Sequence, residues 1–208
     1  MENSHTFSII LPVHNAADKL VQNLPAFLET AAEAGGRVIV IDDMSTDDTP
    51  DVLTRMKAEN PDVLYTTFLP ESVIINPSRL RLAMSVGAKA AQTPYVVLAS
   101  IDRPPHNVGW LYGLADNEIA LVYGLKKGSH VIHVSKDDIE ELRATITKTE
   151  RKNGHGHRGS LLKMRRGLYE AVSVRREHVF DVINMFDRPL SFAQLWSLRC
   201  QVFFGSLF

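Results

Sequence analysis

Polar side chains follow three apolar segments of the sequence, at the positions where each segment ends. His14 and Asn15 follow the first segment, Asp42 and Asp43 end the second, and Asp102 comes shortly after the third. A flat imidazole or amide beside an acidic pair could hold a base and a ribose, because carboxylates accept hydrogen bonds from base N–H groups and ribose hydroxyls. The alternative is that His14 and Asn15 only form a turn, while Asp42 and Asp43 cap backbone amides.

The carboxylate of Asp102 suits a different purpose, the binding of a hard divalent cation. It lies in the stretch YVVLASIDRPP, where an apolar segment runs into Ser-Ile-Asp and ends at two prolines. Mg²⁺ and Mn²⁺ prefer oxygen ligands and are often held by one or two carboxylates together with phosphate and water. One aspartate at the end of a central strand is therefore enough for a cation that binds a diphosphate.

The apolar segments that lead to these residues predict strands. They are rich in branched residues, are bounded by turn formers and are almost continuously hydrophobic, which is typical of strands covered on both faces. The four predicted strands are residues 7–13, 37–43, 62–68 and 95–100.

Helical spacing of apolar residues appears between the predicted strands. Leu20, Leu24 and Leu28 show it in the first interval. Thr49 is expected to cap the second helix with Pro50 at the first helical position, which leaves residues 43–48 as a loop. Because strand and helix alternate, the sequence predicts an α/β fold with a mainly parallel sheet, flanking helices and right-handed crossovers.

The pattern after residue 105 is less regular. Residues 118–125 predict a fifth strand, residues 129–135 a short sixth strand, and residues 136–152 an amphipathic helix. The stretch NGHGHRGS, residues 153–160, offers almost nothing that could pack, so we expect a mobile loop there. The chain is expected to form one domain whose last third is the less regular part.

Composition limits the classes of partner and compartment. A formal net charge of −1 in 208 residues predicts no broad basic surface for nucleic acid. Cys200 is the single cysteine, which excludes an internal disulfide framework and favours a reducing compartment such as the cytoplasm. We expect no signal peptide and no membrane span. The apolar segment 195–208 predicts a core helix or a homodimer contact, with a peripheral helix at the inner face of the membrane as the alternative.

Taken together and in order, three segments resemble the inverting family 2 glycosyltransferases, which have the GT-A nucleotide-sugar-binding fold. FSIILPVHNAADKL is similar to their opening strand and Pro-x-x-Asn turn, VIVIDDMSTDDT to their Asp-Asp-x-Ser-x-Asp-x-Thr segment, and GAKAAQTPYVVLASID to the helix and strand before their Asp-x-Asp metal motif. The resemblance covers residues 7 to 105 well and the remainder in outline. It implies a single domain, 1–208, with a nucleotide-sugar-binding half, 1–105, and an acceptor-side half, 106–208.

The resemblance also implies roles for the polar residues of the first half. Pro12 and His14 would line the donor base, Asp43 would hydrogen-bond it, and Asp102 would bind Mg²⁺ or Mn²⁺ at the diphosphate. Ser100 stands where the family usually has the first aspartate of the motif, so the resemblance implies a lower metal affinity. Ser100 could still donate to a phosphate or ribose oxygen.

Two departures from the family pattern concern the donor diphosphate and the general base. Met84 and Ser85 occupy the usual Arg and Asn positions, while Arg79 and Arg81 lie about one turn earlier and either reach the diphosphate or are solvated. The Glu-Asp pair whose aspartate acts as general base is replaced in the stretch SFAQLWSLR by Phe192, Ala193 and Gln194. Asp187, in a segment similar to the family's Phe-Asp-Glu turn, is the nearest remaining carboxylate and is either the base or a turn cap.

Two further groups of side chains offer weaker hypotheses. Two histidine pairs could bind a transition metal, but neither has a Cys or carboxylate at ligand spacing. The pairs are His130 with His133 and His155 with His157. A cluster of basic residues could close on a diphosphate or an anionic lipid carrier, or could form a solvated face. This basic group comprises Lys163, Arg165, Arg166, Arg175 and Arg176.

The resemblance implies transfer of a sugar from a nucleotide-diphosphate donor to a hydroxyl of a glycan or lipid-linked acceptor, with inversion, as in polysaccharide biosynthesis. A metal at Asp102 would neutralise the leaving diphosphate. The alternative is a catalytically silent domain that binds a nucleotide sugar or a partner subunit and lacks the general base.

Overall fold

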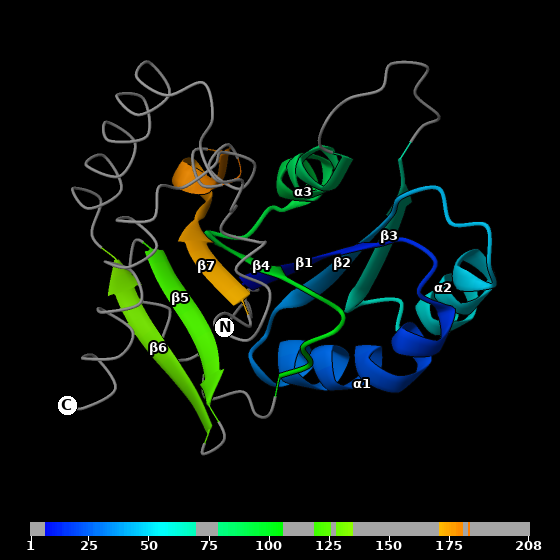
Figure 1. Cartoon of the computed structure of the whole chain (residues 1–208), viewed down its shortest axis with the longest axis horizontal. Helices are drawn as coiled ribbons and strands as arrows, with labels where there is room; N and C mark the ends of the chain where they lie inside the picture. Colours follow the sequence, from blue (N-terminus) through cyan, green and yellow to red (C-terminus); the bar gives the residue numbers. More distant parts are fainter. Residues whose placement is uncertain are drawn as a thin grey trace, which may run out of the picture.

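The computed structural model describes residues 7–69, 79–105, 119–125, 128–134, 171–180 and 183. In this part of the chain, seven strands form one mixed sheet in the order β3-β2-β1-β4-β7-β5-β6 (Figure 1). The strands are β1 (Phe7–Val13), β2 (Arg37–Asp42), β3 (Leu64–Phe68), β4 (Tyr95–Ala99), β5 (Ile119–Leu125), β6 (Gly128–Val134) and β7 (Ala171–Arg175).

The first four strands form the parallel half of the sheet. β1 pairs in parallel with both β2 and β4, and β2 pairs in parallel with β3. β7 then lies antiparallel between β4 and β5, and β6 continues the sheet antiparallel to β5. The predicted α/β fold is confirmed, and the six predicted strands are present. β7 was not predicted, because its five residues follow no strong turn signal.

Helices cover both faces of the parallel half. α1 (Ala17–Glu33) and α2 (Thr49–Glu59) pack on one face and α3 (Arg79–Ala90) on the other (Figure 1). Their apolar stripes give two hydrophobic clusters, one centred on Leu20 and Phe27 and the other on Ala83 and Met84. The near-continuous hydrophobicity of β1 and β2 is explained by this coverage, since residues on both faces of these strands are buried.

Gly87 lets α3 approach the sheet closely. A Cβ atom at this position would lie 2.6 Å from Cγ2 of Ile10 and 2.8 Å from Cδ1 of Ile41. These distances are shorter than any ordinary carbon–carbon contact, so the backbone of α3 rests directly on the side chains of β1 and β2. The position of Arg79, at the start of the same helix, depends on this approach.

The start of α2 corrects one expectation. The helix begins at Thr49 itself, and Asp48 before it makes no side-chain capping bond. The hydroxyl of Thr49 instead accepts a hydrogen bond of 2.8 Å from the backbone N–H of Ala16. The prediction that Thr49 caps α2 is therefore wrong, because its side chain fastens the loop after β1. The loop predicted over residues 43–48 is present.

Several predictions fall outside the described residues. They are the helix at 136–152, the loop at 153–160 and the apolar segment 195–208. The side chains of Asp187, Phe192, Ala193, Gln194 and Cys200 also lie outside them, as do those of the four histidines of the two pairs. Of the helices that the structure does describe, none has the length and apolar character needed to cross a bilayer.

Candidate functional site at the carboxyl edge of the parallel strands

The carboxyl ends of β1, β2 and β4 lie at one edge of the sheet, because the three strands are adjacent and parallel. We call this edge the rim, and define it by residues 14–15, 42–47 and 100–102. In the register of β1 with β2, Val13 lies opposite Asp42, so the next residues, His14 and Asp43, emerge side by side. The backbone N–H of Asp43 donates to the carbonyl of Val13 at 2.8 Å. Ligands of open α/β sheets bind at such an edge.

The imidazole of His14 is held in one orientation by two contacts. Its Nδ1 lies 2.7 Å from the backbone carbonyl of Asp43, and its Nε2 lies 3.4 Å from the side-chain nitrogen of Asn15. A carbonyl can only accept and an amide NH₂ can only donate, so both contacts are satisfied by the neutral tautomer with the proton on Nδ1. An exposed, flat ring is thereby fixed at the rim. Pro12, which is half-buried, lies two residues earlier in β1.

Asn15 fastens the first loop of the rim to the second. Its backbone has φ of 47°, a left-handed conformation that Asn tolerates better than most residues. Its N–H donates to Oγ of Ser45 at 2.8 Å, and its side-chain oxygen accepts from the N–H of Thr46 at 2.8 Å. Asn15 therefore positions the loop, and these bonds support its reading as a turn former.

Asp42 is turned into the protein. The residue is 1% exposed, and Oδ1 accepts from both the N–H and the hydroxyl of Ser45, at 3.0 Å and 2.5 Å. Of the two carboxylates in the acidic pair, this one shapes the loop, which favours the alternative that Asp42 caps backbone amides. Asp43 is the member of the pair that faces the rim.

The carboxylate of Asp43 is held by an arginine from α3. Nε of Arg79 donates to Oδ1 at 2.5 Å, and the guanidinium also forms an ion pair with this oxygen. The hydrogen bond that Arg79 donates to Asp43 raises the pKa of Arg79, so the guanidinium remains charged. Arg81 lies two residues further along α3 and so on a different side of the helix. Of the two arginines considered for the rim, the structure therefore brings Arg79 to the acidic pair.

Asp47 connects the starts of two helices. Its Oδ2 accepts from the N–H of Ala17 at 3.2 Å, and its Oδ1 accepts from the N–H of Thr49 at 3.1 Å. The pKa of Asp47 is lowered below the ordinary value of 3.8 for an aspartate, chiefly by hydrogen bonding to Thr49. A negative charge also suits the positive ends of both helix dipoles. The sequence did not predict this role.

Asp102 lies three residues beyond the end of β4 and is 56% exposed in its side chain. Its Oδ1 forms an ion pair of 2.6 Å with Nζ of Lys19 from α1, a residue that sequence reasoning missed. The N–H of Asp102 points to Oγ of Ser100 at 3.4 Å, and Asn23 of α1 donates to the carbonyl of Ile101 at 2.9 Å. The loop after β4 is thus fastened to α1.

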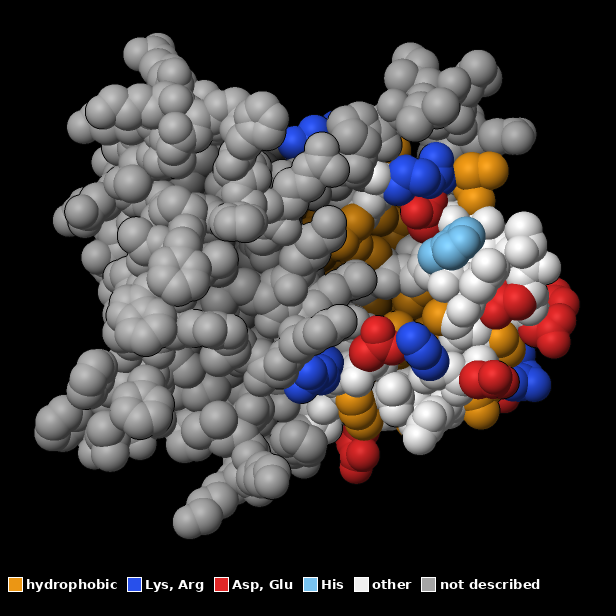
Figure 2. Space-filling model, viewed as in Figure 1, with side chains coloured by type: hydrophobic (Ala, Val, Ile, Leu, Met, Phe, Trp, Pro, Cys, Tyr) orange, Lys and Arg blue, Asp and Glu red, His pale blue; other side chains and the backbone are white. Residues whose placement is uncertain are grey.

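These oxygen atoms suit a hard cation in part. An exposed carboxylate on Asp102 and a hydroxyl on Ser100 are ligands that Mg²⁺ and Mn²⁺ accept, provided that phosphate or water completes the shell. Within the described ranges, no group of three or more His, Cys, Asp or Glu side chains is placed to hold a metal. A cation at Asp102 would also have to separate the carboxylate from Lys19. Figure 2 shows basic side chains next to acidic ones in more than one place on the face viewed. Hydrophobic side chains lie between these places.

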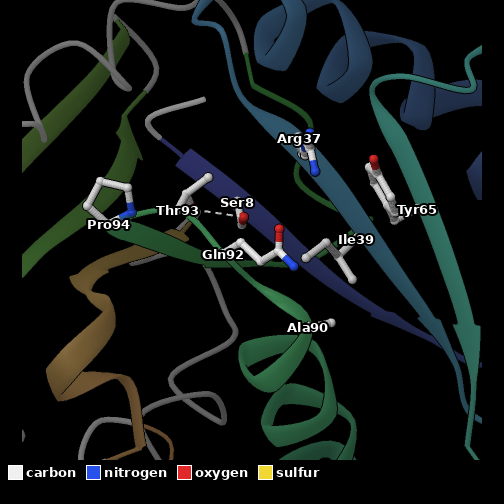
Figure 3. Close-up of a pocket in the computed structure, with 8 residues that line it drawn as sticks. All are labelled: Ser8, Arg37, Ile39, Tyr65, Ala90, Gln92, Thr93 and Pro94. Atoms are coloured by element: carbon white, nitrogen blue, oxygen red, sulfur yellow. Dashed lines mark hydrogen bonds between the residues drawn. The ribbon is translucent and has the colours of Figure 1, made fainter. Parts of the chain in front are cut away.

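The cavity in Figure 3 lies at the opposite edge of the sheet. It has a volume of about 570 Å³ and is lined by Ser8, Arg37, Ile39, Tyr65, Ala90, Gln92, Thr93 and Pro94. Ser8 and Arg37 belong to the amino ends of β1 and β2, and the guanidinium of Arg37 lies 5.0 Å from the ring centre of Tyr65. We place the candidate site at the rim, since the chemistry-bearing side chains lie at the carboxyl ends of the strands.

Arg175 and Arg176 also lie away from the rim. β7 runs antiparallel to β4, so Arg175 at its end pairs with Tyr95 at the start of β4. The N–H of Arg176 donates to the carbonyl of Pro94 at 2.8 Å, and both arginines line a second cavity of about 550 Å³ at this amino-terminal edge. The hypothesis that these two arginines close on a diphosphate at the rim is wrong. The other three members of the basic group lie outside the described residues.

The sheet order, the helical layers and the polar rim define a GT-A glycosyltransferase fold. Residues 8–102 match the family model described as glycosyl transferase family 2. This segment contains every described rim residue. Among curated proteins, no sequence gives a significant match.

One solved structure supports the fold, and two others are similar to the chain. The mannosyltransferase PcManGT from Pyrobaculum calidifontis, in complex with GDP-Man and Mn²⁺, is 20% identical over 87% of this chain and 49% of its own, with a TM-score of 0.55. TarS from S. aureus with UDP-GlcNAc is 18% identical over 91% of this chain and 50% of its own, with a TM-score of 0.47. Glucosyl-3-phosphoglycerate synthase from Mycobacterium tuberculosis with UDP is 20% identical over 83% of this chain and 57% of its own, with a TM-score of 0.46. The chain therefore spans about half the length of these proteins.

Proposed function

We propose that this chain binds a nucleotide-diphosphate sugar at the rim and takes part in transfer of the sugar, with inversion, to a hydroxyl of a glycan or lipid-linked acceptor. The observation that carries the proposal is the fixed carboxylate of Asp43 beside the ring of His14, at the edge where Asp102 also follows β4. The match of residues 8–102 to the model of glycosyl transferase family 2 supports the reaction class.

Asp43 is the group that we assign to the base. Arg79 engages Oδ1, so Oδ2 is the oxygen that would accept an N–H of a uracil or guanine ring. His14 and Pro12 would lie along the face of the base, since the histidine ring is held flat by its two hydrogen bonds. Arg79 serves in this arrangement as a positioning residue that keeps the carboxylate oriented.

Asp102 and Ser100 are the residues that would hold Mg²⁺ or Mn²⁺ at the donor diphosphate. A bound cation would supply charge neutralisation for the leaving diphosphate. The neighbour that was solved with GDP-Man and Mn²⁺ supports a divalent cation in this fold. Ser100, which lies two residues before Asp102, could donate its hydroxyl proton to a phosphate or ribose oxygen.

Acceptor chemistry depends on a carboxylate, for which we propose Asp187. The family's usual base position is occupied by Phe192, Ala193 and Gln194, none of which can accept a proton. The same substitution favours a second candidate function, a catalytically silent domain that binds a nucleotide sugar or a partner subunit. We propose a role in cytoplasmic polysaccharide biosynthesis, with membrane or homodimer contact through the apolar segment 195–208.

Donor binding is tested by titrating the protein with UDP and GDP in a calorimeter, in the presence of Mn²⁺. We expect one of the two to bind and Asp43→Asn to weaken it at least about tenfold, because hydrogen bonds to a charged group contribute about 1.5–3 kcal/mol. Asp62→Asn, an exposed aspartate in the turn before β3, is the matched control. Equal nucleotide affinity of the wild type and Asp43→Asn would contradict the proposed contact between Asp43 and the base. If neither nucleotide bound, the proposed donor site would be wrong.

A further inference from the structure

Lys19 contacts the carboxylate that would receive the cation. Nζ lies 2.6 Å from Oδ1 of Asp102, and the two side chains are 54% and 56% exposed. The lysine belongs to the first turn of α1, which begins just after the first loop of the rim. One turn later, Asn23 donates to the carbonyl of Ile101, next to Asp102 in the chain. Positions 19 and 23 share a helix face, so α1 contacts the loop after β4 at two points.

An ammonium group and a divalent cation are alternative partners for the same oxygen. Binding of Mg²⁺ or Mn²⁺ to Oδ1 of Asp102 requires that Lys19 withdraw, and an ammonium left nearby repels the dication. The loop offers a single carboxylate, since residue 100 is a serine. No second aspartate of the 100–102 stretch can therefore hold the cation while Lys19 keeps Asp102.

We propose that Lys19 is a specificity-determining residue that competes with the divalent cation for Asp102 and keeps a positive charge at the diphosphate position when no metal is bound. The competition follows from the ion pair itself, whereas the role toward the diphosphate rests on the proposed function. Nucleotide binding should accordingly depend less on metal in this chain than in a variant without the lysine charge.

The first experiment measures Mn²⁺ binding without nucleotide, from the electron paramagnetic resonance signal of free Mn²⁺. Lys19→Met removes the charge and keeps an unbranched side chain, and should lower the Kd for Mn²⁺ about two- to fivefold, the range expected for an exposed ion pair. Lys19→Arg should leave the Kd close to the wild-type value. Lys57→Met, at an exposed lysine on α2, is the control for a general loss of positive charge.

Asp102→Asn locates the Mn²⁺ site and should weaken binding in both the wild-type and the Lys19→Met background. The competition is overturned if Lys19→Met and Lys57→Met have the same Kd, or if Asp102→Asn retains the wild-type affinity. Melting temperatures of all variants establish that they are folded, as expected for substitutions at exposed positions.

The second experiment measures the affinity for UDP and GDP with and without Mn²⁺. Lys19→Met should bind the nucleotide more weakly without metal and show a larger gain when Mn²⁺ is added. An unchanged gain would overturn the role toward the diphosphate. If neither the wild type nor the variant binds a nucleotide, the proposed donor site fails, while the Mn²⁺ titration still decides the competition at Asp102.

Discussion

At the scale of single residues, the rim divides its acidic side chains between structure and ligand. Asp42 is buried against Ser45, Asp47 ties two helix starts together, and Asp43 faces the rim with Arg79. The sequence placed these carboxylates on one loop but could not separate their roles. The difference depends on which way each side chain turns. For Asp43 and Asp47 this involves contacts with Arg79 and Ala17, which lie 36 and 30 positions away in the sequence.

The role of Asp47 predicts a dependence of stability on pH. Because the pKa of Asp47 is lower in the folded protein than the ordinary value of 3.8, its contribution to stability is fully present above pH 3.8 and is lost as the pH falls through the folded pKa. Asp47→Asn should lower the free energy of unfolding at pH 7. In acid, the difference in stability between the variant and the wild type should become smaller. Urea unfolding at neutral and acidic pH measures both effects.

Asp48→Asn is the control for Asp47, since Asp48 is the adjacent exposed carboxylate and makes no side-chain capping bond. It should destabilise the protein less than Asp47→Asn at pH 7. The assignment of Asp47 as the link between the two helices fails if the two variants are equally stable, or if the difference from wild type grows on acidification.

At the scale of elements, the strands and helices of the parallel half could be predicted from short stretches of sequence. Four apolar runs became β1 to β4, and the amphipathic stretches between them became α1 to α3, because both faces of the parallel strands must be buried. β7 shows where this reasoning stops. Its place between β4 and β5 is set by pairing with residues 49 to 80 positions away, such as Tyr95 with Arg175, and no short window of sequence contains that information.

The packing of α3 on the sheet yields a prediction for Gly87. Gly87→Ala should gain up to about 1 kcal/mol in helix propensity. It should lose about 1–3 kcal/mol by overpacking, because the new methyl group would lie 2.6 Å from Ile10 and 2.8 Å from Ile41. We therefore expect a net loss of stability in denaturant unfolding, together with weaker nucleotide binding, since α3 positions Arg79.

Two variants separate the close contact from a general effect of substitution in α3. Ile41→Val removes the Cδ1 atom that the new methyl group would meet, so the double variant with Gly87→Ala should recover part of the stability lost by Gly87→Ala alone. Lys89→Ala, at an exposed position on the same helix, should have little effect. A Gly87→Ala protein as stable as the wild type would show that α3 can move away from the sheet without cost.

At the scale of the whole molecule, residues 8–102 carry both the family match and the rim, while the chain as a whole covers 49% of the PcManGT structure. We propose that residues 106–208 form the acceptor side. The places of Pro12, His14, Asp43 and Asp102 at or just after the carboxyl ends of strands could be predicted from ordered motifs. Lys19 could not, because an exposed lysine on a helix surface carries no signal of its own.

At the same scale, catalysis requires a general base for the acceptor hydroxyl in addition to a bound donor. Asp187 is the residue that we propose as this base. A general base typically contributes about 10²- to 10⁴-fold to a transfer rate. If Asp187 is the base, Asp187→Asn should reduce sugar transfer by a factor in that range and leave nucleotide affinity unchanged, since the donor site that we propose lies at the rim. Transfer from radiolabelled UDP- and GDP-sugars to lipid-linked and soluble glycan acceptors gives the rate, and calorimetry gives the affinity. Asp181→Asn, at the nearest aspartate earlier in the sequence, is the control. An unchanged rate in Asp187→Asn would exclude it as the base, and a wild type that binds donor but transfers to no acceptor would identify the silent domain.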